Sequence, residues 1–174
     1  RGSDEGDSSC VGIEYKNLPN SVEVDDILLL DDGKMRLRVD SVSATTISCT
    51  VVIGGKLSSR KGVNKLGGGI AAPALTEKDK NDIKSMESIQ PDFVAVSFVA
   101  SVGDIEEARS LLNEVEVNAG IIAKIERAEV VAESGLLDDI IDACEGVMVA
   151  RGDLGIEGGD APFTGIHKDL ISRT

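Results

Sequence analysis

Residues 121–157 read IIAKIERAEVVAESGLLDDIIDACEGVMVARGDLGIE, and this stretch decides the predicted fold. It contains two short aliphatic runs, Ile121–Ile125 and Val147–Ala150, separated by a segment that we expect to be helical over Val130–Ala143. Buried aliphatic strands that alternate with helices are typical of parallel α/β structure. In such folds, functional side chains gather at the carboxyl ends of the strands. We therefore expect a site on the residues at the carboxyl ends of these two strands.

The same alternation of strands and helices begins further upstream. Thr76, with Asp79 three residues later, resembles the capping box that begins a helix, and predicts a helix over Glu77–Ile89. A strand at Phe93–Phe98, a helix at Asp104–Glu114 and a last helix at Phe163–Ser172 complete the pattern. The order αβαβαβα predicts parallel βα units, about three and a half of them.

The first part of the chain has a different hydrophobic pattern, with apolar residues at every second position. After a polar, acidic segment over residues 1–20, the run Ile27–Leu30 ends at Asp31-Asp32-Gly33, which is a hairpin-turn signal. Apolar and polar residues then alternate from Met35 and again through Ile47–Ile53. We expect a small, half-buried antiparallel β module, followed by a glycine-rich connector over Lys61–Gly69.

The composition limits the class of protein. Hydrophobic residues make up 41% of the chain but aromatic residues only 2%, so the core must be aliphatic, which suits parallel strands with helices on both faces. The formal net charge of −13 argues against nucleic acid or an anionic membrane as a partner.

Localisation is predicted from what the sequence lacks. The three cysteines form no CxxC pair and are expected to be free thiols in a reducing compartment. No apolar run approaches the roughly 20 residues that span a bilayer, and no secretory signal is visible. We expect a cytoplasmic protein. The start at Arg1, without a methionine, suggests a piece of a longer chain.

Lys124 and Glu126 are the first candidate site residues. Residues two apart in a strand face the same way, so both side chains project together at the carboxyl end of an aliphatic strand. Such charges are costly to bury unless they are paired or functional. A simple ion pair at the strand edge is the alternative interpretation.

The segment Arg151–Gly155 follows the next strand. Its glycines flank Asp153 and let backbone N–H groups approach an anionic ligand. Asp153 beside Glu126 would suit a hard divalent cation such as Mg²⁺, and Lys124 would supply positive charge to a phosphoryl group or an enolate. The Arg-Gly-Asp tripeptide follows a buried strand, which argues against a role in cell adhesion.

Six blocks of this sequence resemble pyruvate kinase, in the same order and at the same spacing, over about Val11 to Ile171. AKIERAE and VMVARGDLGIE are the most specific of them, and the chain is most similar to a bacterial-type isoform. The other four blocks are DILLLDDG, KGVNKLGGG, ALTEKDK and AVSFV.

The resemblance implies a fold and an activity. Residues 1–66 would be part of the family's mobile antiparallel β-barrel lid, inserted in a partial (β/α)8 TIM barrel formed by residues 67–174. The activity would be transfer of the phosphoryl group of phosphoenolpyruvate to ADP, giving pyruvate and ATP in glycolysis. Mg²⁺ (or Mn²⁺) and K⁺ would be cofactors, and the full-length protein would be a homo-oligomer, commonly a tetramer.

The resemblance also implies roles in the barrel part. Lys124 would stabilise the transferring phosphoryl group, and Ser97 would lie near it and orient it, unless it is only a small residue bonded to backbone. Glu126 and Asp153 would bind the metal. The last group is the substrate-binding backbone, which comprises Ala150, Arg151 and Gly152, with Asp153 beside it.

In the lid part, Asp32 and Lys61 match positions that reach the nucleotide or its metal. A plain hairpin turn at Asp32 and a solvated lysine at 61 are the alternatives. The sequence departs from the family at Ala100, where arginine is usual, and at His167, where glutamine is usual and where we expect a helix-surface residue. The Ile-Pro that follows the GVE motif in the family is missing here.

Three hypotheses stay open at this point. The chain is a portion of a genuine pyruvate kinase, or a truncated non-catalytic relative that binds a partner or nucleotide, or another Mg²⁺-dependent pyruvate or enolate barrel enzyme. The lid module before Thr76 argues against the third. Groups expected on the missing barrel strands would hold phosphate and K⁺, so we expect these 174 residues alone to be inactive.

Overall fold

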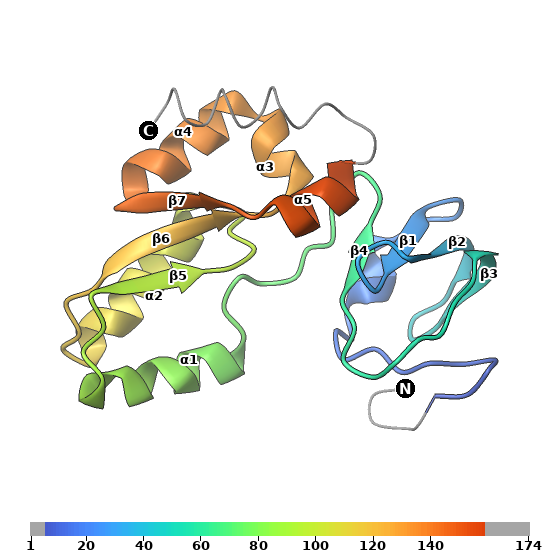
Figure 1. The fold of residues 1–174 in the computed structure, drawn as a ribbon, viewed down its shortest axis with the longest axis horizontal. Coiled ribbons are helices and arrows are strands. Elements are labelled where there is room, and N and C mark those ends of the chain that lie inside the picture. Colours follow the sequence, from blue (N-terminus) through green and yellow to red (C-terminus); the bar gives the residue numbers. More distant parts are fainter. Residues whose placement is uncertain (1–5, 159–174) are drawn as a thin grey trace. The chain divides into compact units, whose positions relative to one another are not determined.

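The computed structural model describes residues 6–158 and divides into two compact units, with the division between Ala72 and Pro73 (Figure 1). Each unit has its own sheet and its own hydrophobic core. The boundary expected after residue 66 lies a few residues before this division.

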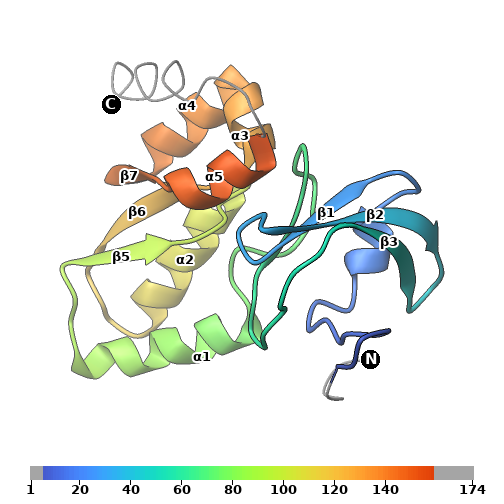
Figure 2. The ribbon, with the colours of Figure 1, turned by 45° about the vertical axis from the view of Figure 1, so that its right-hand side comes forward.

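The first unit is built on antiparallel strands. Its four-stranded sheet has the order β3-β2-β1-β4, and Figure 2 shows β1, β2 and β3 side by side. The turn after β1 is the predicted one: Asp31, Asp32 and Gly33 all have positive φ, at 49°, 58° and 75°. Aspartate and glycine are residues that tolerate this backbone. The described elements are η1 (Leu18–Ser21), β1 (Ile27–Leu30), β2 (Met35–Val42), β3 (Ile47–Ile53) and β4 (Val63–Lys65).

The short strand β4 was not expected, because the glycines around it predicted only a connector. Val63–Lys65 pairs with β1, with Leu30 opposite Val63 and Leu28 opposite Lys65. The pairing satisfies the second edge of β1, and this long-range partner is invisible to a local pattern. Lys65 also pairs with Asp26, at 3.4 Å, which adds an ion pair beside the ladder.

The core of the first unit confirms that the module is half buried. Leu28, Leu30, Met35 and Val39 are buried together with Leu18. On β3, in contrast, the apolar side chains of residues 51–53 are exposed. The buried cluster therefore forms on β1 and β2, and β3 is an exposed edge of the sheet.

The second unit is a parallel α/β structure, as predicted. Its three-stranded sheet has the order β5-β6-β7, and both strand pairs are parallel. The strands are β5 (Phe93–Val96), β6 (Gly120–Ile125) and β7 (Gly146–Val149), and the helices are α1 (Glu77–Lys84), η2 (Ser85–Ser88), α2 (Val102–Glu114), α3 (Ala128–Ala132), α4 (Ser134–Ala143) and α5 (Arg151–Gly158).

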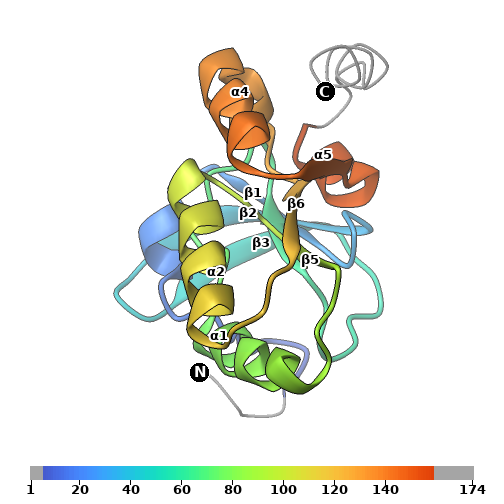
Figure 3. The ribbon, with the colours of Figure 1, turned by 90° about the vertical axis from the view of Figure 1, so that its left-hand side faces the viewer.

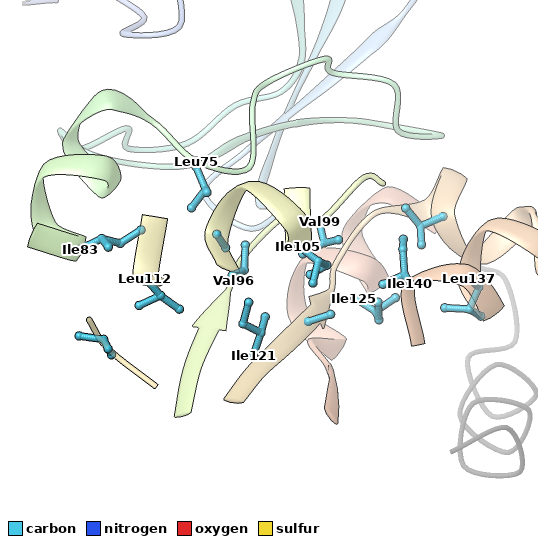
Figure 4. Close-up of a cluster of buried hydrophobic side chains, with 14 residues drawn as sticks. Leu75, Ile83, Val96, Val99, Ile105, Leu112, Ile121, Ile125, Leu137 and Ile140 are labelled. Carbon is cyan, nitrogen blue, oxygen red and sulfur yellow. The ribbon is translucent and has the colours of Figure 1, made fainter. Parts of the chain in front are cut away.

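One face of this sheet packs on the helices α2 and α4 (Figure 3). Ile121 and Ile125 of β6 are fully buried there, against Ile105 of α2 and Ile140 of α4 (Figure 4). A single side of each strand thus supplies the core of the unit.

In the described part of the chain, the opposite face of the sheet carries exposed side chains and is uncovered. Phe93 of β5 and Met148 of β7 are 59% and 46% exposed. Ala95, two residues after Phe93 on β5, is exposed as well. The expectation of helices on both faces is therefore wrong for the described part of the chain. The alternation along β6 places Lys124 on this uncovered face, opposite Met148 in the register.

Several predicted boundaries shift. The helix expected to Ile89 changes to a 3₁₀ turn after Lys84, and the helix expected from Asp104 begins at Val102. The single helix expected over Val130–Ala143 is two helices, because Glu133 between them has extended backbone, with φ −104° and ψ 95°. The helix expected at 163–172, which includes position 167, lies outside the described residues.

Acidic side chains cap the starts of the helices α1 and α2. The predicted capping box at α1 is confirmed: Asp79 N–H donates to Thr76 Oγ1 at 3.2 Å, and Thr76 N–H donates to Asp79 Oδ2 at 2.8 Å. At α2, Asp104 Oδ2 accepts from the backbone N–H groups of Ala100 and Ser101.

Among the described residues, no helix has the length and apolar character needed to cross a membrane.

The amino end of β6 is fixed by Glu145. Its Oε2 accepts the N–H of Ile121 at 2.6 Å, and its Oε1 pairs with Arg109 at 3.0 Å. The backbone bond to Ile121, and then Arg109, lower the pKa of the Glu145 carboxyl. Arg109 also donates to the carbonyl of Ala143 at 3.0 Å, so one carboxylate links α2, β6 and the end of α4.

Thr76→Ala should lower the free energy of unfolding by about 1 kcal/mol, because it removes the side-chain cap of α1. A urea titration of the chain measures the change. Ser110→Ala, the matched removal of a hydroxyl from the exposed body of α2, should leave stability nearly unchanged or slightly higher. Equal losses in the two variants would contradict the capping role.

Glu145→Gln should destabilise the chain at neutral pH, and the difference from wild type should shrink in acid. The folded-state pKa of Glu145 lies below its ordinary value of 4.5. Its stabilisation is therefore complete above about pH 4.5 and is lost as the pH falls through the folded pKa. Urea titrations at several pH values measure this, with Glu106→Gln as the control for net charge. A difference that stays constant down to about pH 3 would rule out the proposed linkage.

Candidate active site

The three parallel strands end side by side, and the residues that follow them form the candidate site. Ser97 follows β5, Glu126 follows β6 and Ala150 follows β7. The parallel register continues past the strands, because Ala150 N–H donates to the carbonyl of Ile125 at 3.1 Å. This edge is the carboxyl end of the sheet, where α/β folds place their sites.

Lys124 contacts both Ser97 and Glu126. Lys124 Nζ donates to Ser97 Oγ at 2.8 Å and pairs with Glu126 Oε1 at 2.7 Å. Glu126 is only 2% exposed, whereas the Lys124 side chain keeps 25% of its surface. The ammonium group is therefore held by a hydroxyl and a carboxylate and still reaches solvent. The structure brings together these three predicted residues from two neighbouring strands.

Phe98 and Arg127 extend this cluster, and neither was singled out from the sequence. Phe98 N–H donates to Glu126 Oε2 at 2.6 Å, and Arg127 Nε donates to the Phe98 carbonyl at 2.8 Å. Arg127 is 6% exposed and also pairs with Glu129 at 3.5 Å. The strand predicted to reach Phe98 ends at Val96, because Phe98 turns to φ 54°.

One feature of the sequence could have pointed to Arg127: it lies directly after Glu126 at the end of a buried strand. A second charge at that point is costly to bury and so indicates a partner. No local pattern shows which backbone group that partner is.

The residues after β7 form a helix. α5 begins at Arg151, and Leu154 N–H donates to the carbonyl of Ala150 at 3.3 Å. Asp153 lies in the first turn of α5 and is half buried, while Gly152 is exposed and a Cβ added there would meet no atom within 4 Å. The glycines thus do not prevent a helix, and its N-terminal N–H groups follow directly on the strand.

Two of the predicted residues at this edge carry the type of oxygen ligand that a hard divalent cation binds. Glu126 and Asp153 offer carboxylate oxygens from the ends of neighbouring strands. No group of three or more His, Cys, Asp or Glu residues that could hold a metal occurs between residues 6 and 158. Mg²⁺ commonly binds one or two carboxylates and completes its shell with water and substrate oxygens, so two carboxylates suffice.

The candidate residues of the first unit lie around the β1–β2 turn. Lys61 pairs with Asp31 at 2.8 Å, and Lys34 pairs with the same carboxylate at 3.2 Å. The bond to Asp31 raises the pKa of Lys61, and the bonds from Lys61 and then Lys34 lower the pKa of Asp31. Asp32 is exposed and adds only a weaker attraction to Lys61. Asp31, which the sequence analysis did not select, is therefore the direct partner of Lys61.

A parallel α/β sheet with a lysine and acidic residues at the carboxyl ends of its strands is typical of α/β enzymes. The comparison with protein families makes this specific: the family described as pyruvate kinase, barrel domain, matches residues 2–174. The chain belongs to the pyruvate kinase family.

Curated relatives agree with this assignment. The chain is 51% identical to pyruvate kinase of Haemophilus influenzae over 170 residues, which is 98% of this chain and 36% of that protein. It is 51% identical to pyruvate kinase II of Salmonella typhimurium, over 99% of this chain and 36% of the relative. Plastidial pyruvate kinase 3 of Arabidopsis thaliana is 42% identical over 84% of this chain and 25% of its own length. The chain therefore spans about a third of the length of the bacterial relatives.

Lys124→Met should lower the free energy of unfolding by about 3 kcal/mol, because it leaves the buried Glu126 carboxylate without its cation. The double variant Lys124→Met with Glu126→Gln should recover part of that loss, since the remaining group is neutral. Urea titrations of the two single variants and the double variant give the coupling energy. Strictly additive effects would show that the two side chains do not depend on each other.

Proposed function

We propose that these residues are part of a pyruvate kinase that transfers the phosphoryl group of phosphoenolpyruvate to ADP, giving pyruvate and ATP in glycolysis. The observation that carries this proposal is the contact of Ser97, Lys124 and Glu126 at the carboxyl end of the sheet, in a chain of this family. The relatives are all named pyruvate kinase, which favours neither a different enolate enzyme nor a non-catalytic relative.

Lys124 is the proposed catalytic residue. Its ammonium group is partly exposed and is oriented by Ser97 Oγ at 2.8 Å and Glu126 Oε1 at 2.7 Å. A cation held in a fixed place stabilises the charge of a transferring phosphoryl group without reorganisation during the reaction. Ser97 accepts a hydrogen bond from this ammonium group and so supports the orienting role that the resemblance implies.

The proposed metal is Mg²⁺ or Mn²⁺, and Glu126 and Asp153 would hold it. When bound, such an ion supplies positive charge that draws phosphate oxygens into place. Glu126 Oε1 and Oε2 each accept one hydrogen bond here, and a carboxylate has about four lone-pair sites, so room remains for a metal bond. K⁺ is proposed as a second cofactor of the longer chain.

The proposed substrate contacts lie on α5 and its start. The backbone of Ala150, Arg151 and Gly152 would bind the substrate carboxylate, with Asp153 beside it. The support is that α5 begins at Arg151, because the first N–H groups of a helix are free to bind anions.

In the first unit, Asp32 and Lys61 are proposed to reach the nucleotide or its metal. Lys61 is exposed and its side chain is directed by Asp31, so a mobile ligand can approach it. We also propose that this unit is the lid and that the second unit is part of a (β/α)8 barrel. A homo-oligomer, such as a tetramer, and a cytoplasmic location are proposed for the complete protein.

In the complete protein, Lys124→Met should lower kcat for phosphoryl transfer by at least about 10²- to 10³-fold, the usual effect of removing one electrostatic stabiliser. Binding of Mn²⁺ measured by electron paramagnetic resonance should stay largely intact, because Glu126 and Asp153 remain. Lys80→Met is the matched control, since Lys80 pairs with Glu107 at 2.8 Å away from the strand ends. Near-normal turnover by the Lys124 variant would remove this residue from its proposed role.

A further inference from the structure

Two consecutive residues after β6 bind both polar groups of one residue after β5. Glu126 Oε2 accepts from Phe98 N–H at 2.6 Å, and Arg127 Nε donates to the Phe98 carbonyl at 2.8 Å. We call Phe98, Glu126 and Arg127 the strand-end clamp. The clamp ties the backbone that follows β5 to the backbone that follows β6.

The clamped residue has a conformation that its own side chain does not favour. Phe98 has φ 54°, in the left-handed region that bulky residues rarely adopt. Its side chain is 38% exposed, so packing of the ring does not fully enclose it. The two backbone hydrogen bonds from Glu126 and Arg127 are therefore the interactions that oppose relaxation of Phe98 to negative φ.

Arg127 is a buried cation at the edge of this cluster. It is 6% exposed, and a buried guanidinium is costly unless its N–H groups are bonded. Two of its partners are the Phe98 carbonyl and Glu129 Oε1, at 2.8 and 3.5 Å. The side chain therefore connects the Phe98 backbone to the start of α3.

The consequence reaches the candidate catalytic lysine. Ser97 precedes Phe98, and its Oγ accepts from Lys124 Nζ, so rotation of the Phe98 backbone would move this hydroxyl. The bond from Phe98 N–H also occupies Glu126 Oε2 and leaves Oε1 for Lys124. Both of the groups that hold the ammonium are thus fixed through Phe98.

We propose that Arg127 is a positioning residue, which holds Phe98 in the left-handed conformation and thereby fixes Ser97 and Glu126 around Lys124. The link to phosphoryl transfer rests on the function proposed above. The strand-end clamp itself does not rest on that function, because its hydrogen bonds can be observed without measuring turnover.

The test compares substitutions at both ends of the clamp in the full-length chain. Arg127→Gln removes the donor, and Phe98→Val places a β-branched residue where φ is positive, which such residues resist. Phe98→Asn is the conservative variant, because asparagine tolerates this conformation. Gln90→Val is the matched control: Gln90 also has positive φ, at 48°, but precedes β5.

Amide hydrogen exchange followed by NMR is the first measurement. Arg127→Gln and Phe98→Val should speed exchange at the backbone amide of residue 98 at least about tenfold. Exchange at the Ile121 amide, which donates to Glu145 at the other end of β6, should stay within about twofold. Phe98→Asn should preserve most of the protection, and Arg127→Gln combined with Phe98→Asn should exchange more slowly at position 98 than Arg127→Gln alone.

Steady-state kinetics with phosphoenolpyruvate and ADP are the second measurement. Arg127→Gln should lower kcat about 10- to 100-fold, the effect of a small misplacement of reacting groups, with the KM for ADP changed less than about threefold. Gln90→Val should leave kcat unchanged.

An unchanged Phe98 amide in Arg127→Gln would overturn the proposal. A uniform rise in exchange over the whole second unit would overturn it as well, since it would show only lost stability. Absence of turnover in the wild-type full-length protein would instead refute the proposed function, and exchange at Phe98 would still decide whether Arg127 holds this backbone.

Discussion

The buried carboxylate of Glu126 constrains the whole carboxyl edge of the parallel sheet. A charge that is 2% exposed loses its hydration and must be matched inside the protein. Here the match comes from two directions, the Lys124 ammonium on one oxygen and the Phe98 N–H on the other. Because these partners belong to two different strands, the carboxylate fixes how the ends of β5 and β6 meet. The same contacts keep a lysine oriented at a partly open position.

The two ends of the sheet use carboxylates in different ways. At the amino end, Glu145 binds the Ile121 N–H and Arg109, and its side chain is 44% exposed, so its contribution is to hold helix and strand together. At the carboxyl end, Glu126 is buried beside a lysine that reaches the uncovered face of the sheet. The proposed catalytic residues and the stabilising contacts of Glu145 would thus lie at opposite ends of β6, which is the division expected for parallel α/β folds.

The periodicity of the chain was enough to predict most strands. Alternation predicted β2 and β3, and short apolar runs predicted β1, β5, β6 and β7, within a residue or two at most ends. Thr76 and Asp79 predicted the start of α1, because a capping box is formed by residues close in sequence. β4 was missed, since a strand of three residues between glycines is defined by its pairing with β1 rather than by its own pattern. The helix α5 was not predicted to begin at Arg151, because its glycines lower helix propensity, although they do not forbid a helix.

By itself the sequence determined that Lys124 and Glu126 project from the same face at the end of a strand, because a period of two is a local property of the backbone. It also determined the family, through motifs that span nearly the whole chain. Only the tertiary structure decided that Ser97 bonds to Lys124, that Asp31 rather than Asp32 pairs with Lys61, and that Arg127 reaches the Phe98 carbonyl. Each of these depends on which segments distant in sequence become neighbours, which burial and pairing across strands decide. The contacts of Ser97 and Arg127 depend as well on the backbone turn at Phe98.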